Sequence, residues 1–188
     1  LKADEAHIVN TSSVNGFWAS LGPHVSHTSY AAAKFAVKGF TEAMVTDLRL
    51  TAPHIKCSVV MPGHIGTSIV ANSFKVQAGS QSDTMTKQQI DMVRARIAST
   101  GADTSKMSDA DVAKIAQERA RRFLELAPTS AAQAAKIILD GVKADRWRIL
   151  VGDDAHVIDK RVRAEPERAY DVDFFEEVAK EVGWKLGN

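Results

Sequence analysis

The stretch IKCSVVMPG at residues 55–63 decides the fold of this chain. Its apolar and β-branched residues predict a buried strand, which Pro62 and Gly63 end. From Tyr30 to Leu50, apolar residues recur at steps of three and four, which predicts a helix leading into that strand, with Ser29 as its N-cap. A helix followed by a buried strand is typical of an α/β sheet.

Two further strands are predicted, one on either side of this pair. His7–Asn10 precedes a polar turn, and Arg148–Val151 follows a helix that Thr129 or Ser130 caps and that runs to about Ala144. Strand, helix and strand in this order predict right-handed βαβ units on a parallel sheet. We expect an α/β fold, a Rossmann-like doubly wound parallel sheet, of which this chain holds the C-terminal three strands.

The first predicted strand would have an unpaired edge in such a sheet. The chain begins Leu1-Lys2-Ala3 and reaches this strand without a signal peptide or an opening helix. We therefore expect residues 1–188 to form a single domain, incomplete at its N-terminus, with the remaining strands outside this sequence. Residues 68–128 are expected to form a long insertion within it, with amphipathic helices at 87–99 and 109–127.

The composition is that of a globular protein without a dominant charge. The 188 residues are 45% hydrophobic and 25% charged, with a formal net charge of +1. A net charge this small would not attract nucleic acid or an anionic membrane. No apolar run reaches the ~18 residues of a transmembrane helix. The single cysteine, Cys57, cannot form a disulfide within the chain or share a metal site with another cysteine. We expect a cytoplasmic protein without a metal, nucleic-acid or membrane partner.

Three polar motifs follow the predicted elements. Ser13 stands three residues before Gly16 at the carboxyl end of the first strand, where ligands bind in open α/β sheets. Tyr30 and Lys34 lie one turn apart on one helix face, where the cation favours the phenolate and makes the phenol a usable acid or base. Each pattern alone has a simpler interpretation, a turn for the serine and a solvated pair for the tyrosine and lysine.

The third motif is PGHIGT at residues 62–67, directly after the buried strand. Its glycines allow a close backbone approach and Thr67 offers a hydroxyl, although alone it is only a strand-ending turn. In this order the three motifs resemble the signature of the classical short-chain dehydrogenases/reductases. The resemblance covers residues 7–67 well and the helix and strand at 129–154 more loosely.

The resemblance implies an NAD(P)-dependent oxidoreductase that interconverts an alcohol and a ketone or aldehyde by hydride transfer. It assigns Ser13 to the substrate oxygen, with Ser12 as the alternative, Tyr30 to general acid/base catalysis, and Lys34 to the support of that tyrosine and to the nicotinamide ribose. The cofactor, NAD or NADP, would be bound by the following residues: Tyr30, Lys34, Pro62, Gly63, Ile65 and Thr67.

The chain departs from the family pattern in two places. Ser13 and Tyr30 are 17 positions apart, so the loop from Phe17 to Thr28 carries an insertion whose His24 and His27 either contact the substrate or are merely solvated. The glycine-rich turn that holds the cofactor phosphates is expected upstream of this segment. Two alternatives stay open: a non-catalytic cofactor-sensing protein of the same fold, and an epimerase or dehydratase of the family's extended branch.

The resemblance also implies the partners. Residues 68–128 occupy the family's substrate-lid position, and their apolar helix faces either roof a lipophilic alcohol or ketone or pack on the domain or on a partner subunit. The helix from Tyr30 to Leu50 carries apolar residues beyond a single stripe, Phe35 and Phe40 among them. In the family this helix pairs with its symmetry mate, so we expect a homodimer or homotetramer.

Overall fold

The computed structural model describes residues 3–22, 25, 27–78 and 84–184, which fall into two compact units. The first unit takes in the described residues up to Ile65 and those from Pro128 onward, and the second takes in those of Gly66–Ala127. The first unit carries the sheet and the second is helical. No helix in the described part of the chain is both long enough and apolar enough to cross a membrane.

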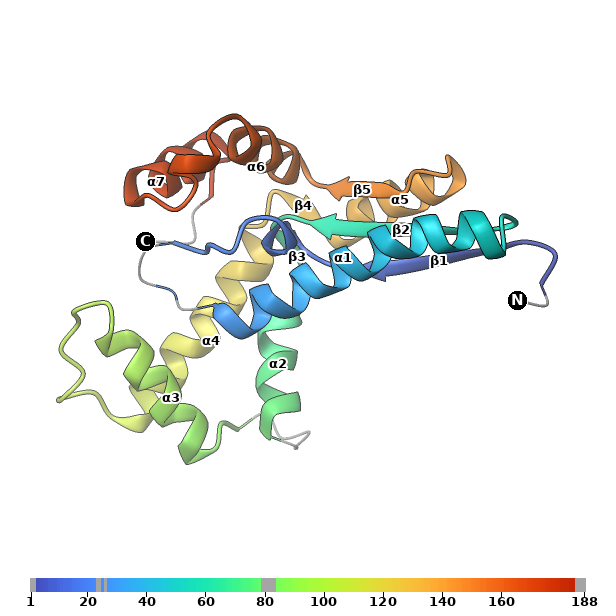
Figure 1. The fold of residues 1–188 in the computed structure, drawn as a ribbon. Helices are drawn as coiled ribbons and strands as arrows, with labels where there is room; N and C mark the ends of the chain where they lie inside the picture. The colour runs from blue at the N-terminus through green and yellow to red at the C-terminus, as the bar shows by residue number, and fades with distance from the viewer. Residues whose placement is uncertain (1–2, 23–24, 26, 79–83, 185–188) are drawn as a thin grey trace. The chain divides into compact units, whose positions relative to one another are not determined.

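The first unit is built on a parallel sheet of three strands in the order β1–β2–β5 (Figure 1). They are β1 (Ala6–Thr11), β2 (Ile55–Pro62) and β5 (Arg148–Val151). β2 lies in the middle, and the register pairs Thr11 with Val60 and Pro62 with Val151. The carboxyl ends of all three strands therefore lie at one edge of the sheet. The predicted Rossmann-like α/β class, with three parallel strands in this chain, is confirmed.

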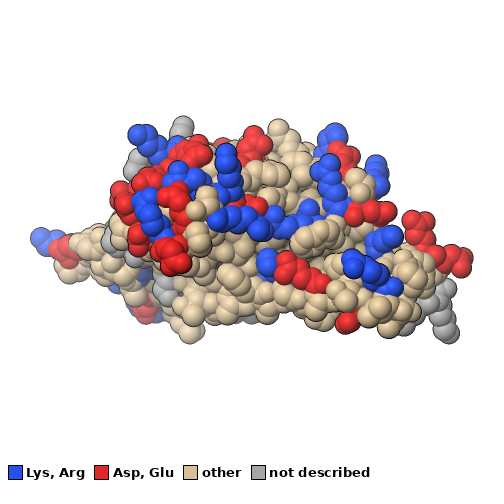
Figure 2. Space-filling model, turned by 45° about the horizontal axis from the view of Figure 1, so that its top comes forward, with Lys and Arg blue, Asp and Glu red and all other residues tan. Residues whose placement is uncertain are grey.

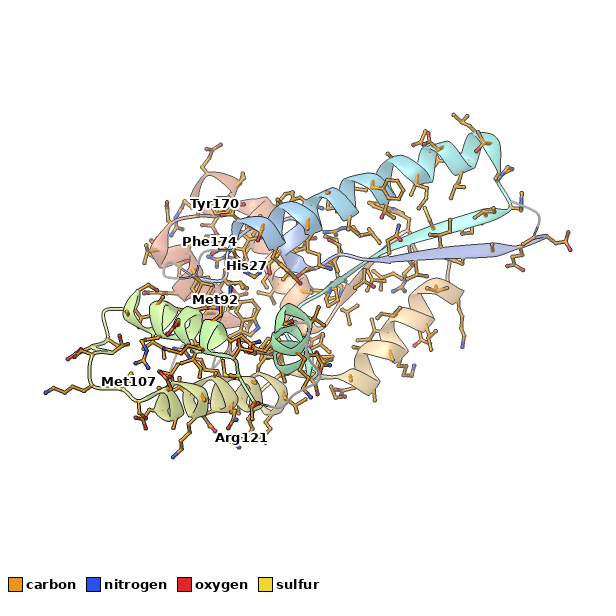
Figure 3. All side chains as sticks on the ribbon, turned by 90° about the horizontal axis from the view of Figure 1, so that it is seen from below. His27, Met92, Met107, Arg121, Tyr170 and Phe174 are labelled. Carbon is orange, nitrogen blue, oxygen red and sulfur yellow. The ribbon has the colours of Figure 1, made fainter. Side chains whose placement is uncertain are left out.

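Two helices cover opposite faces of the sheet, α1 (Thr28–Thr51) and α5 (Ala131–Lys143) (Figures 1 and 3). Alternate side chains of a strand point to opposite faces. Accordingly Cys57 of β2 packs in a core cluster with residues of α1, whereas Val60 packs in another with residues of α5. The buried run that predicted β2 from the sequence is thus a strand covered on both sides.

The handedness of the second crossover differs from our expectation. The strand order advances in one direction while α1 and α5 lie on opposite faces, so the two crossovers have opposite hands. The connection from β1 through α1 to β2 is right-handed, and the expectation of a right-handed unit is wrong for the connection from β2 to β5. The right-handed preference arises when a twisted strand leads through a helix straight back to the sheet. Here the second unit intervenes between β2 and α5, which removes that constraint.

The start of α1 also differs from the sequence interpretation. The helix begins at Thr28, so Ser29 lies inside its first turn, and the N-cap is His27, whose side chain forms no capping hydrogen bond. The His27 ring instead packs on the Tyr30 ring, with 4.5 Å between the centroids. A capping rule based on residue type does not weigh such a side-chain contact. By contrast, Ser130 caps α5 as expected, in a reciprocal capping box with Gln133.

The second unit holds the two helices predicted between residues 68 and 128 and one more. They are α2 (Ile69–Ala78), which the sequence did not indicate, α3 (Lys87–Ala98) and α4 (Asp109–Glu125). Val93 and Ile97 of α3 are buried against Val112 and Ala116 of α4. The apolar faces of these two helices therefore form a small core of their own.

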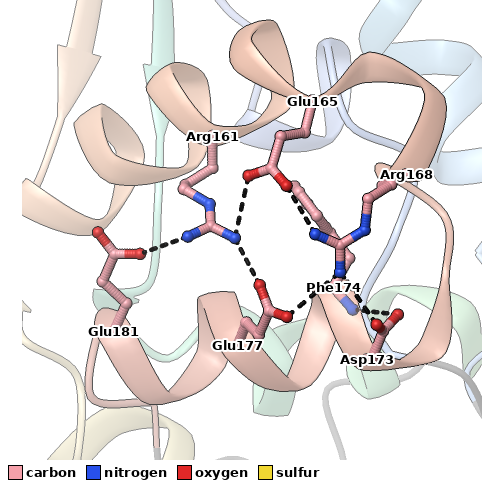
Figure 4. A network of polar contacts seen from close by, with 7 residues as sticks. All are labelled: Arg161, Glu165, Arg168, Asp173, Phe174, Glu177 and Glu181. Atoms are coloured by element: carbon pink, nitrogen blue, oxygen red, sulfur yellow. Dashed lines mark hydrogen bonds and ion pairs between the residues drawn. The ribbon is translucent and has the colours of Figure 1, made fainter.

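The last elements of the first unit form a helical hairpin, named the C-terminal hairpin: α6 (Asp153–Ala164), a 3-10 turn η2 (Pro166–Arg168) and α7 (Val172–Glu181). Arg161 of α6 and Arg168 of η2 each bind the carboxylate of Glu165, which follows α6, and two carboxylates of α7 (Figure 4). On the face drawn in Figure 2, the densest mixture of acidic and basic side chains lies over this hairpin. Two short strands, β3 (Ile65–Gly66) and β4 (Thr129–Ser130), pair with each other.

An ion pair between β5 and α6 gives the fold a testable pH dependence. Arg148 binds Asp159 through its two terminal guanidinium nitrogens, at 2.6 and 3.1 Å, and each side chain is 16% exposed. Burial acts to raise the pKa of Asp159, but hydrogen bonds from Arg148 and Arg163 outweigh it and hold the pKa below its usual range. A carboxylate with a depressed pKa in the folded state stabilises the fold above its unfolded pKa of about 3.9, and this stabilisation is lost as pH falls through the folded pKa.

We predict that Asp159→Asn lowers the free energy of unfolding by about 2 kcal/mol near neutral pH, because charge-assisted hydrogen bonds are lost. Urea titrations from pH 7 to pH 3 should show the difference between the wild type and the variant shrinking below about pH 4. A difference that stays constant over that range would mean that the carboxylate charge is not what stabilises this contact.

Candidate active site

Ser13 lies where β1 ends and a short 3-10 turn, η1 (Val14–Gly16), begins. It is the N-cap of η1, and its Oγ accepts a hydrogen bond from the backbone N–H of Asn15 at 3.1 Å. The residue is 8% exposed. Because Oγ acts as the acceptor in this bond, the hydroxyl hydrogen of Ser13 remains able to donate to another group.

Ser12 has a different partner. Its Oγ donates to the backbone oxygen of Lys34 at 2.7 Å, which ties the end of β1 to the second turn of α1. Gly16 makes this close approach possible: a Cβ there would overlap the Ser12 Oγ and come within 2.9 Å of the same Lys34 oxygen. The Ser12 hydroxyl hydrogen is therefore already engaged in holding η1 against the helix.

Tyr30 and Lys34 lie together at the start of α1, as their spacing predicted. The Lys34 Nζ is 5.5 Å from the centroid of the Tyr30 ring and donates a hydrogen bond to the backbone oxygen of Thr11 at 3.0 Å. Tyr30 is 37% exposed. The ammonium group thus sits between the carboxyl end of β1 and the phenol ring.

His27 is one of the two loop histidines for which either a substrate contact or mere solvation was expected. Its ring packs on the Tyr30 ring at the start of α1, and Figure 3 labels it there. It is half-buried. His24 lies outside the described residues. His27 therefore contacts a proposed catalytic side chain.

The turn after β2 lies at the same edge of the sheet as the end of β1. Pro62 closes β2, and Gly63 donates its N–H to the backbone oxygen of Val151 at 3.0 Å. Ile65 is buried at 9% exposure. Register pairing of β1 with β2 therefore brings the predicted cofactor turn beside the strand that leads to Ser13.

Thr67 belongs to the second unit, whereas the other predicted site residues belong to the first. It lines an open cavity of about 470 Å³ within that unit. The other lining residues are Ser68, Ile69, Asn72, Ser73 and Val76. The wall of this cavity mixes hydroxyl and amide groups with two exposed aliphatic side chains.

Two residues beside the site escaped the sequence analysis. Asp154, 2% exposed, accepts the backbone N–H of His64 at 2.6 Å and so holds the turn after β2. Trp18 is fully buried, donates its Nε1 to the backbone oxygen of Ala169 at 2.6 Å and packs on Phe174 of the C-terminal hairpin. Both contacts join residues far apart in the sequence, so no local pattern reveals them, although a tryptophan in a polar loop is a signal of burial.

Comparison with known proteins gives three findings. A family model described as short chain dehydrogenase matches residues 1–78. The chain is 31% identical over 163 residues to "Putative oxidoreductase SadH" of Mycobacterium tuberculosis, which covers 87% of this chain and 45% of that protein. It is 36% identical over 64 residues to "Dehydrogenase/reductase SDR family member 11" of Gallus gallus, covering 34% of this chain and 24% of that protein.

A solved structure is also similar, that of a short chain dehydrogenase/reductase from Burkholderia phymatum in complex with NAD. The identity is 28%, the match covers 87% of this chain and 48% of that chain, and the TM-score is 0.48. The chain thus spans about half the length of SadH and of this structure, and less of the Gallus gallus protein. The family model, the relatives and the ordered motifs at the ends of parallel strands agree: the chain is similar to the short-chain dehydrogenases/reductases.

Proposed function

We propose that the protein is an NAD(P)-dependent oxidoreductase that interconverts an alcohol and a ketone or aldehyde, with Tyr30 as the general acid/base. The observation that carries this proposal is the position of Lys34. Its ammonium group is hydrogen-bonded at the carboxyl end of β1 and lies 5.5 Å from the Tyr30 ring. A cation fixed there stabilises negative charge that develops on the Tyr30 oxygen during proton transfer.

The residues present fit the nicotinamide end of such a cofactor. In open α/β sheets, nucleotides bind outside the carboxyl ends of the strands, which is where Lys34 and the turn from Pro62 to Ile65 lie. The Lys34 ammonium has three hydrogens and uses one on Thr11, so it retains donors for a ribose hydroxyl. The nicotinamide ring would be lined by Pro62, Gly63, Ile65 and Thr67. When bound, the cofactor supplies or accepts the hydride.

The protein's own residues move the proton and hold the substrate oxygen. In the reductive direction the Tyr30 Oη gives its proton to the carbonyl oxygen, and in the oxidative direction it takes the proton from the alcohol. Ser13 donates a hydrogen bond to the same oxygen and stabilises its developing negative charge. The contacts support Ser13 over Ser12, because Ser12 already donates its hydrogen to Lys34.

The second unit is proposed as the substrate-binding part. The small core between α3 and α4 occupies their apolar faces, so a lipophilic substrate has to be bound by other side chains. Ile69 and Val76 are 52% and 80% exposed and line the cavity of that unit. These exposed apolar side chains support a substrate that is an alcohol or ketone with an apolar body.

A homodimer or homotetramer remains part of the proposal. Phe35 and Phe40 of α1 are 41% and 65% exposed. Large aromatic side chains exposed along one helix support an interface with a second copy of the chain.

The variant Tyr30→Phe tests the proton transfer. It should lower turnover at least about a thousandfold, because it removes only the transferable proton. Cofactor affinity and the unfolding transition should stay within experimental error of the wild type. Turnover should be measured over pH 5 to 10 on the natural protein with NAD(H) and NADP(H), and substantial activity at any pH would remove Tyr30 from this role.

The variant Lys34→Ala tests the second function of the lysine. It should lower turnover and also raise the cofactor Kd about tenfold, because a ribose contact and the cation beside Tyr30 are lost together. Lys38→Ala is the matched control, since Lys38 lies one turn further along α1 and pairs with Glu42 instead. If Lys34→Ala lowers turnover while cofactor affinity is unchanged, the proposed ribose contact is wrong.

A further inference from the structure

The buried carboxylate of Asp154 is the feature of the first unit that the proposed mechanism leaves unexplained. It lies in the first turn of α6 and is 2% exposed. Its Oδ1 accepts the N–H of Ala155 at 2.9 Å, and its Oδ2 accepts both the N–H of His64 at 2.6 Å and the Trp184 Nε1–H at 3.0 Å. Burying a carboxylate is costly unless donors surround it, and here each oxygen has at least one.

Two glycines make room for this carboxylate. A Cβ at Gly63 would overlap all three atoms of the Asp154 carboxyl group. A Cβ at Gly152 would lie 2.5 Å from the Asp154 Oδ1, and Gly152 also has a φ of +98°, which favours glycine. The backbone is therefore shaped around Asp154 from the β2 side and from the β5 side.

We propose that Asp154 is a positioning residue that fixes the turn from Pro62 to Ile65 for the nicotinamide cofactor. This inference rests on the proposed function. The turn follows β2 and Asp154 follows β5, so the His64–Asp154 bond joins the carboxyl ends of two adjacent strands. The helix start at Asp154 adds the positive end of the α6 dipole, which stabilises a negative charge at this position.

The C-terminal hairpin supports the hydrogen bond between His64 and Asp154. Arg161 of α6 binds the carboxylates of Glu165, which follows α6, and of Glu177 in α7, and its guanidinium lies over the ring of Phe174 at 5.5 Å (Figure 4). Trp184 follows α7 and reaches back to Asp154. The same hairpin anchors the loop after η1 through Trp18. Both loops that flank the site thus rest on one hairpin, and Asp154 is its contact with the cofactor turn.

Two variants of Asp154 in the natural protein test the proposal. Asp154→Ala removes every acceptor, so the His64 amide should exchange with deuterium at least about tenfold faster and the cofactor KM should rise about tenfold, as expected when a charge-assisted hydrogen bond is lost. The substrate KM at saturating cofactor should change less than about twofold. Asp154→Asn keeps the shape of the side chain and one acceptor oxygen. The His64 exchange rate and the cofactor KM should therefore be much closer to the wild-type values than in Asp154→Ala.

Leu48→Ala separates positioning from general stability. Leu48 is buried near the end of α1, in the core cluster with Ala52, Ile55 and Cys57. It should lower the unfolding temperature at least as much as Asp154→Ala while leaving the cofactor KM unchanged. A cofactor KM that rises equally in Leu48→Ala and Asp154→Ala would show that Asp154 acts only through stability and would overturn the proposal.

Amide exchange keeps this inference distinct from the proposed function. If the wild-type protein transfers no hydride from either cofactor, the proposed function fails. Faster exchange of the His64 amide in Asp154→Ala still supports the role of Asp154 in fixing the turn. If the wild type is active but Asp154→Ala changes neither His64 exchange nor the cofactor KM, the proposed function stands and the role of Asp154 is refuted.

Discussion

The contact between η1 and α1 at Gly16 is the constraint on which the candidate site depends. It allows the Ser12 hydroxyl to reach the backbone of Lys34, while the Lys34 ammonium returns to the backbone oxygen of Thr11. These two hydrogen bonds join the end of β1 to α1 in both directions. They leave Ser13 capping the turn and hold the cation near Tyr30, so the arrangement of the candidate site depends on the close packing at Gly16.

The parallel sheet brings the other groups of the candidate site to the same edge as that contact. Because β1, β2 and β5 end at one edge, Ser13, the Pro62 turn and Asp154 come from three successive strand ends. Each strand end has its own support: α1 for β1, and the C-terminal hairpin for the turns after β2 and β5. In α/β folds, functional residues commonly lie on loops that a rigid scaffold positions, and ligands bind at such sheet edges.

Much of this could be predicted from the sequence because its signals are local. The run at residues 55–63 and the spacing of Tyr30 and Lys34 depend on periodicity and on neighbours a few positions apart. No local pattern indicates the His64–Asp154 bond, which spans 90 positions, or the opposite hand of the second crossover. Such features depend on how distant segments meet. The cap of α1 differs for another reason: the expectation of Ser29 rests on residue type alone, which does not weigh the local ring contact between His27, the N-cap, and Tyr30.

The most direct test compares Gly16→Ala with Gly39→Ala. A Cβ at Gly39, in the middle of α1, would meet nothing within 4 Å, so that substitution should leave activity unchanged and stabilise the helix by about 0.5–1 kcal/mol. Gly16→Ala should force η1 away from α1, lower the free energy of unfolding by about 1–3 kcal/mol and abolish hydride transfer from the reduced cofactor. Wild-type stability and hydride-transfer rate in Gly16→Ala would contradict the account, because the site would then not depend on this contact.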